Sequence, residues 1–108
     1  MNKKVINIGV IGLGNIGGYF CNEIIRKKKE IYSKIGKSIN LLYVSAKNKN
    51  KKRKFKLKKN QWINNPINIT KSTNIDIVVE LIGGSDGLAK KIVISALNNK
   101  KHVITANK

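Results

Sequence analysis

Three glycines with the spacing Gly12-x-Gly14-x-x-Gly17 constrain this chain more than any other feature of its sequence. They follow an apolar, β-branched run at residues 5–11, which predicts a strand buried on both faces. Apolar residues then recur at spacings of four and seven through residues 16–35, which predicts one helix. The glycines therefore lie in a turn between a buried strand and a helix.

This strand–turn–helix context gives each glycine a role in binding a dinucleotide. Gly12 lets the chain turn sharply out of the strand, and Gly14, which has no side chain, lets a diphosphate approach the backbone. Gly17 lets the helix pack closely against the sheet. The helix N-terminus offers unpaired N–H groups and a positive dipole end to the phosphates. The alternative is a glycine-rich turn that holds no ligand.

The rest of the chain alternates strands with helices. Apolar runs predict three further strands, at residues 39–46, 75–82 and 102–105. An amphipathic pattern predicts a second helix at residues 88–97. This order predicts a single α/β domain over residues 1–108, with a Rossmann-type parallel sheet and helices on both of its faces.

Two stretches interrupt this alternation. Residues 47–59 are strongly basic and of low complexity, and because like charges repel one another, we expect an exposed, mobile connection there. Residues 62–74 contain Pro66 and several asparagines, which predicts an irregular segment with a short strand or turn. Neither stretch indicates a second domain.

The formal net charge of +18 raises the question of a nucleic-acid partner. Only Arg26 and Arg53 among the 23 basic residues are arginines, although proteins that bind phosphates and bases draw heavily on arginine. Joint enrichment in lysine, asparagine and isoleucine is typical of an A+T-biased coding background. We therefore expect no nucleic-acid partner. The alternative is a small basic nucleic-acid-binding module that uses residues 47–59 beside Phe55 and Trp62.

Other classes of protein are excluded by what the chain lacks. A single cysteine, Cys21, rules out an internal disulfide framework and fits the reducing cytoplasm, where we expect the protein to be located. Together with His102 it cannot form a metal site, so we expect no metal and assign Cys21 to packing within the first helix. No apolar run approaches the ~20 residues that a membrane-spanning helix needs.

Charged residues near two strand ends bear on the cofactor. The second predicted strand ends without the acidic residue that commonly binds the ribose of NAD. Lys47 and further cations follow it instead, and a cationic loop suits the extra phosphate of NADP, with NAD remaining possible. Glu80 lies within an apolar strand, where a carboxylate is costly unless it has a partner. A structural hydrogen bond and a role in an active site both remain open for Glu80.

Three blocks together resemble homoserine dehydrogenase: residues 9–18 (GVIGLGNIGG), 78–84 (VVELIGG) and 101–108 (KHVITANK). They occur in that family's order, and the likeness covers nearly the whole chain. The resemblance implies an oxidoreductase that reduces aspartate semialdehyde to homoserine with NADPH or NADH. That reaction lies on the route to threonine, methionine and isoleucine.

The resemblance also implies a role for individual residues. The backbone around Asn15 and Ile16 would hold the pyrophosphate, beside the three motif glycines. Lys47 would lie near the adenosine 2′ position, with Asn48 in the place of the family's common acidic residue. Gly83 would approach the ribose–nicotinamide end. Lys108 would lie by the nicotinamide and act as a catalytic residue, polarising the substrate carbonyl as hydride arrives.

Members of this family are several times longer than 108 residues, and a substrate-binding, dimerising region follows the segment matched here. We therefore expect a C-terminally truncated cofactor-binding domain, without the catalytic and dimerisation region through which the family forms homo-oligomers. The expectation for the chain alone is little or no dehydrogenase activity. A fragment, one piece of a split enzyme and a decayed gene product all fit this expectation.

Overall fold

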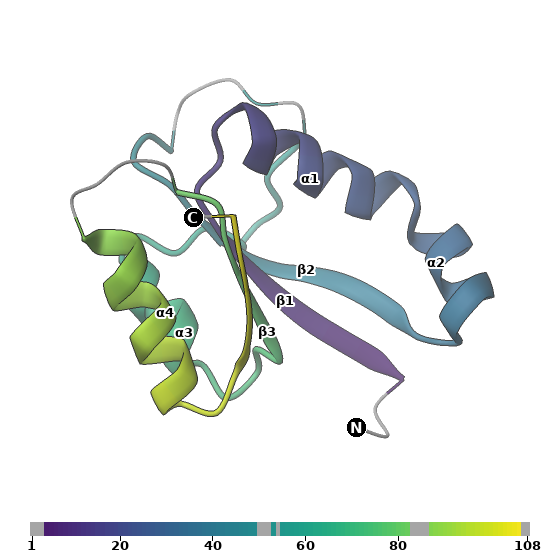
Figure 1. Ribbon diagram of the computed structural model, residues 1–108. Helices are drawn as coiled ribbons and strands as arrows, with labels where there is room; N and C mark the ends of the chain where they lie inside the picture. The colour runs from purple at the N-terminus through teal and green to yellow at the C-terminus, as the bar shows by residue number, and fades with distance from the viewer. Residues whose placement is uncertain (1–3, 50–52, 54, 83–86, 107–108) are drawn as a thin grey trace.

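The four strands form one sheet in which every neighbouring pair is parallel (Figure 1). The computed structural model describes residues 4–49, 53, 55–82 and 87–106. The strands are β1 (Val5–Ile11), β2 (Ser38–Ser45), β3 (Ile77–Glu80) and β4 (His102–Thr105), in the spatial order β2-β1-β3-β4. The predicted Rossmann-type α/β fold is confirmed, and each predicted strand is present with small changes at its ends.

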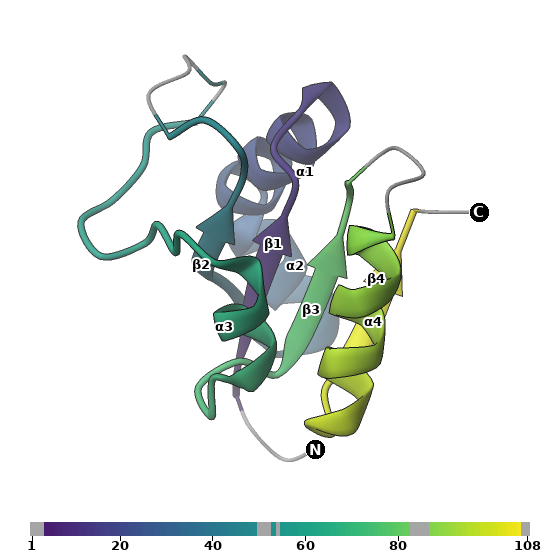
Figure 2. The ribbon, with the colours of Figure 1, turned by 90° about the vertical axis from the view of Figure 1, so that its left-hand side faces the viewer.

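Helices cover both faces of the sheet, as predicted (Figure 2). One face carries α1 (Asn15–Arg26) and α2 (Lys28–Ile35), and the opposite face carries α3 (Pro66–Lys71) and α4 (Leu88–Asn98). This arrangement follows from the connections, because a parallel strand can be reached only by a crossover, and each crossover here contains a helix.

Each face of the sheet has its own hydrophobic core, and β1 contributes to both. Ile8 and Val10 pack under α1 with Cys21, while Ile11 packs on the other side with Ile69 and Ile92. A strand that is buried on both sides needs apolar residues at successive positions, which explains the nearly unbroken apolar run of β1.

The predicted single helix over residues 16–35 is wrong in one respect, because the chain kinks at Lys27 and forms α1 and α2. Ile24 and Ile31 are seven residues apart, a spacing that suits a continuous and a kinked helix equally well. Ile16 and Ile35, the outer members of the apolar pattern, are 70% and 54% exposed and belong to neither core.

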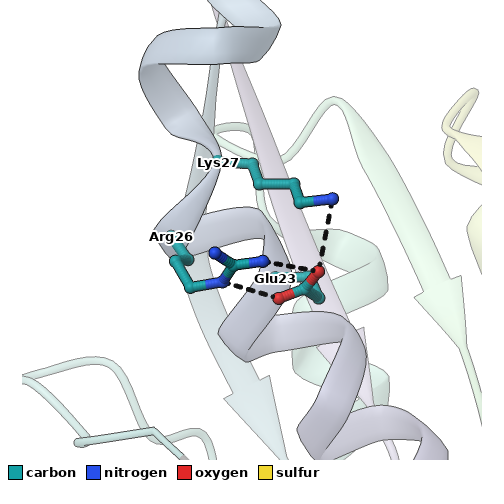
Figure 3. Close-up of polar contacts among 3 residues, drawn as sticks. All are labelled: Glu23, Arg26 and Lys27. Atoms are coloured by element: carbon teal, nitrogen blue, oxygen red, sulfur yellow. Dashed lines mark hydrogen bonds and ion pairs between the residues drawn. The ribbon is translucent and has the colours of Figure 1, made fainter.

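Charged side chains cluster at this kink (Figure 3). The Arg26 guanidinium donates to the Glu23 carboxylate over 2.9 Å, and the Lys27 ammonium lies 3.5 Å from the other Glu23 oxygen. The hydrogen bond from Arg26 lowers the pKa of the Glu23 carboxyl below its ordinary value. Exposed pairs of this kind add little to stability.

The prediction for residues 62–74 is correct in part: Trp62 forms a short parallel bridge with Val44, but the segment also contains the unpredicted helix α3. The side chain of Asn65 accepts a hydrogen bond from the Ile67 N–H over 3.1 Å, and Pro66 occupies the first helical turn. Proline and asparagine begin a helix at these positions as readily as they interrupt one. Ile69 then extends into the core between α3 and the sheet.

The basic stretch 47–59 is only partly the exposed connection we expected. Lys47 and Lys56 are exposed, but Phe55 is buried in the core beneath α1. Phe55 therefore anchors the second half of this stretch in the core. None of the helices among the residues that the structure describes has the length and apolarity that a membrane span requires.

Two isoleucines of α4 provide a test of the packing on that face. Ile92 is fully buried, whereas Ile94 is 47% exposed. Ile92→Ala should lower the free energy of unfolding by about 3 kcal/mol because it leaves a cavity between α4 and the sheet. Ile94→Ala should change it by about 0.5 kcal/mol or less. Urea unfolding followed by circular dichroism measures both, and equal losses would contradict this packing.

Candidate functional site

A cavity of about 540 Å³ lies at the carboxyl edge of the sheet. Its walls are formed where the chain leaves the carboxyl ends of β1, β2 and β3, at residues 11–14, 45–48 and 81–82; we call these segments the exits of the strands. The remaining lining residues are Arg53, Asn64, Pro66 and Leu88. The chain leaves β1 toward β2 on one side and later places β3 on the other, so the strand order reverses above β1. In open parallel sheets, ligands bind in the crevice at such a reversal.

The turn after β1 is wedged between the exits of β2 and β3. The Gly12 N–H donates to the Ser45 carbonyl over 2.8 Å, and the Leu81 N–H donates to the Ile11 carbonyl over 2.8 Å. Gly12 has a φ of +99°, and a Cβ there would lie 2.8 Å from the Leu81 carbonyl carbon and 2.9 Å from the Ile82 nitrogen. Glycine is therefore required at position 12 by backbone conformation and by space.

Gly17 and Gly14 differ sharply in their surroundings. A Cβ on Gly17 would lie 1.9 Å from the Gly12 carbonyl oxygen, so α1 approaches the backbone of the turn itself. A Cβ on Gly14 would meet no atom within 4 Å, and Gly14 borders the cavity. The packing of the protein thus explains glycine at position 17 and leaves open space at position 14.

The N-terminus of α1 begins beside this open space. Gly14 is the N-cap residue, no side chain caps the helix, and its first turn contains no acidic residue. Backbone N–H groups in a first turn lack intrahelical partners, and the helix dipole adds positive charge there. Asn15 and Ile16 occupy this turn and are exposed, although they are not among the residues that line the cavity.

The β2 side of the cavity is cationic. Lys47 is exposed and lines the cavity, and the uncharged Asn48 lines it beside Lys47. The structure therefore brings Lys47 to the same cavity as Gly12 and Gly14.

Arg53 is a second cation at this wall that the sequence analysis did not single out. Its guanidinium donates to the backbone carbonyls of Asn48 and Lys49, the latter over 2.9 Å, and lies 5.3 Å from the ring centre of Trp62. The Trp62 indole N–H donates to Asn64 over 2.8 Å. Arginine and tryptophan stack readily, but these two residues are well separated in the sequence, and their spacing gave no signal that they meet.

Glu80 is fully buried, and its carboxylate oxygens both accept hydrogen bonds. The Ile82 N–H donates to Oε2 over 2.7 Å, and the Thr105 hydroxyl donates to Oε1. Of the two roles left open for Glu80, these contacts show the hydrogen-bonding one. The side chain is not among those that line the cavity.

The remaining candidate residues fall outside the cavity or outside the described structure. Gly83 and Lys108 lie outside the described residues. Cys21 is in the core, as predicted, where burial raises the pKa of its thiol to about 12. His102 is exposed at the first position of β4.

Residues 12–108 match the family model described as homoserine dehydrogenase, NAD binding domain. The chain belongs to this family. It is 37% identical to a homoserine dehydrogenase of Methylobacillus glycogenes and 33% identical to one of Neisseria gonorrhoeae, each over 97% of this chain. The crystal structure of S. aureus homoserine dehydrogenase superimposes with a TM-score of 0.86 over 96% of this chain, at 32% identity.

The resemblance stated from the three sequence blocks is thus confirmed. The chain spans about a quarter of the relatives that it matches: 24% of the Neisseria protein, 25% of the Methylobacillus protein and 26% of the S. aureus structure. Its match is to the nicotinamide-dinucleotide-binding part of homoserine dehydrogenase. These matches give no support to the alternative of a nucleic-acid-binding module.

The contrast between Gly17 and Gly14 gives a prediction for stability. Gly17→Ala should cost about 3 kcal/mol of unfolding free energy, because its Cβ would meet the backbone of Gly12, which cannot move aside. Gly14→Ala should cost about 1 kcal/mol or less, the loss of a favourable N-cap residue. Thermal unfolding of both variants provides the comparison. If the Gly14 variant were the less stable, the described turn would be wrong.

Proposed function

We propose that this chain binds NADP(H) in the cavity at the carboxyl edge of the sheet. In this proposal residues 1–108 form one NAD(P)-binding unit of an enzyme that reduces aspartate semialdehyde to homoserine. The observation that carries it is the open space over Gly14 at the uncapped N-terminus of α1. Membership of the homoserine dehydrogenase family supports this choice of substrate and reaction.

The pyrophosphate would lie over Gly14. The turn after β1 is fixed on both sides by the hydrogen bonds of Gly12 and Leu81, so the site is formed before the ligand arrives. A diphosphate there would accept hydrogen bonds from the backbone N–H groups of the first turn, at Asn15, Ile16 and Gly17. A volume of about 540 Å³ is in the usual range for small-molecule sites.

The adenosine half would extend toward the exit of β2. Lys47 lines the cavity there and would pair with the 2′-phosphate of NADP. Asn48 carries no charge and leaves that phosphate unopposed, whereas a carboxylate in its place would favour the free ribose hydroxyl of NAD. These two residues support NADP over NAD.

The nicotinamide half would extend toward the exits of β3 and β4. Once bound, the nicotinamide supplies the hydride for reduction of the substrate carbonyl. We propose that Gly83 lies close to the ribose of this half. Lys108 would be the catalytic residue that polarises the carbonyl, stabilising the negative charge that develops on oxygen. Support comes from the family relationship and from β4, whose carboxyl end lies at the same edge of the sheet as the cavity.

Binding of the cofactor can be followed through Trp62, the single tryptophan, which stacks with the cavity residue Arg53. NADPH should change its fluorescence saturably and should still bind at about 200 mM salt, where nonspecific binding to single-stranded DNA is weakened. Gly14→Leu should abolish binding because its side chain would fill the space of the diphosphate. Full NADPH binding by that folded variant would contradict the proposal.

Lys47 provides the test of cofactor preference. Lys47→Met should weaken NADPH binding about tenfold, the effect of losing one charge-assisted hydrogen bond, and leave NADH binding unchanged. Lys49→Met is the matched control, since Lys49 is exposed on the same segment but does not line the cavity. Equal loss of NADPH and NADH affinity in the Lys47 variant would argue against a contact with the 2′-phosphate.

A further inference from the structure

Glu80 is the one charged side chain that is buried among the described residues. Removing a carboxylate from water is costly unless hydrogen bonds replace the lost hydration. The hydrogen bonds that replace this hydration also restrain the groups that donate them. The two oxygens of Glu80 bond to two different segments, and both segments lie at the carboxyl edge of the sheet.

The first segment is the exit of β3, and it forms a wall of the turn after β1. Glu80 Oε2 accepts from the Ile82 N–H over 2.7 Å. The peptide between Leu81 and Ile82 is the one that Gly12 packs against, and the Leu81 N–H is bonded to β1. Fixing the Ile82 nitrogen therefore fixes the surface on which the turn rests.

The second segment is the end of β4. Thr105 is directly opposite Glu80 in the parallel register, and its hydroxyl donates to Glu80 Oε1. The Ala106 N–H donates to the Glu80 backbone carbonyl over 3.1 Å. One buried residue thus holds together the exits of β3 and β4, on the opposite side of β1 from Lys47.

We propose that Glu80 is a positioning residue that sets the shape of the nicotinamide half of the dinucleotide site without touching the cofactor. This inference rests on the proposed function. A dinucleotide that places its adenosine at the exit of β2 must cross the strand reversal above β1. Its other half then meets the two exits that Glu80 joins.

The test compares two probes on the purified 108-residue chain. NADPH occupies both halves of the site, whereas adenosine 2′,5′-bisphosphate occupies only the adenosine half. Glu80→Leu removes both hydrogen bonds and should weaken NADPH binding about tenfold or more, with the affinity for the bisphosphate unchanged. Glu80→Gln should restore NADPH affinity, because its amide oxygen can accept from Ile82 and its amide nitrogen can donate to the Thr105 oxygen.

If Glu80→Leu does not fold, a threonine variant and its control keep the test decisive. Thr105→Val removes one of the two bonds and should weaken NADPH binding a few-fold, with the bisphosphate again unaffected. Thr70→Val is the matched control, because the Thr70 hydroxyl bonds to Ile67 and Ser95 between α3 and α4, outside the cavity lining. It should leave the ratio of the two affinities unchanged.

The outcomes separate the inference from the proposed function. If the unaltered chain bound neither probe, the proposed function itself would fail, and the positioning role with it. If it bound both, and folded Glu80 or Thr105 variants weakened both equally or neither, the positioning role would be overturned while the proposed function stood. Selective loss of NADPH affinity, rescued by glutamine, supports the inference.

Discussion

The contact between the turn after β1 and the start of α1 determines the rest of this structure. The Gly12 carbonyl oxygen lies so close to Gly17 that a Cβ at position 17 would be 1.9 Å from it. This contact sets how α1 leaves the sheet, and hence where its first N–H groups lie. The glycines at positions 12 and 17 are needed by the protein itself. The open space at Gly14 is what remains for a ligand.

The sheet order turns this local geometry into a site. Because β2 and β3 lie on opposite sides of β1, their exits form the two walls beside the glycine turn. One wall presents Lys47 and Arg53, and the other is apolar and is fixed from behind by the buried Glu80. NADP has a similarly uneven distribution of charge, because its adenosine half carries an additional phosphate. The cationic wall therefore suits the adenosine half of the proposed ligand. The same asymmetry supports one orientation for the proposed ligand.

The sequence predicted the fold more completely than it predicted the details of the site. Apolar runs and the glycine spacing predicted the strands and the turn, because burial on two faces leaves a strong local pattern. The kink at Lys27 left no such pattern, since the spacing of Ile24 and Ile31 suits either form. Pro66 was ambiguous because proline begins helices as well as interrupting them. Arg53 reaches the cavity through tertiary contacts with Trp62, which residue spacing does not encode.

Backbone amide NMR during an NADPH titration tests the central claim most directly. Saturable shifts of the Gly14, Asn15 and Ile16 amides, with small changes in α4, are the predicted result. Shifts that concentrate instead on Lys56, Lys58 and Lys59, or no saturable shift in the glycine turn, would contradict the account.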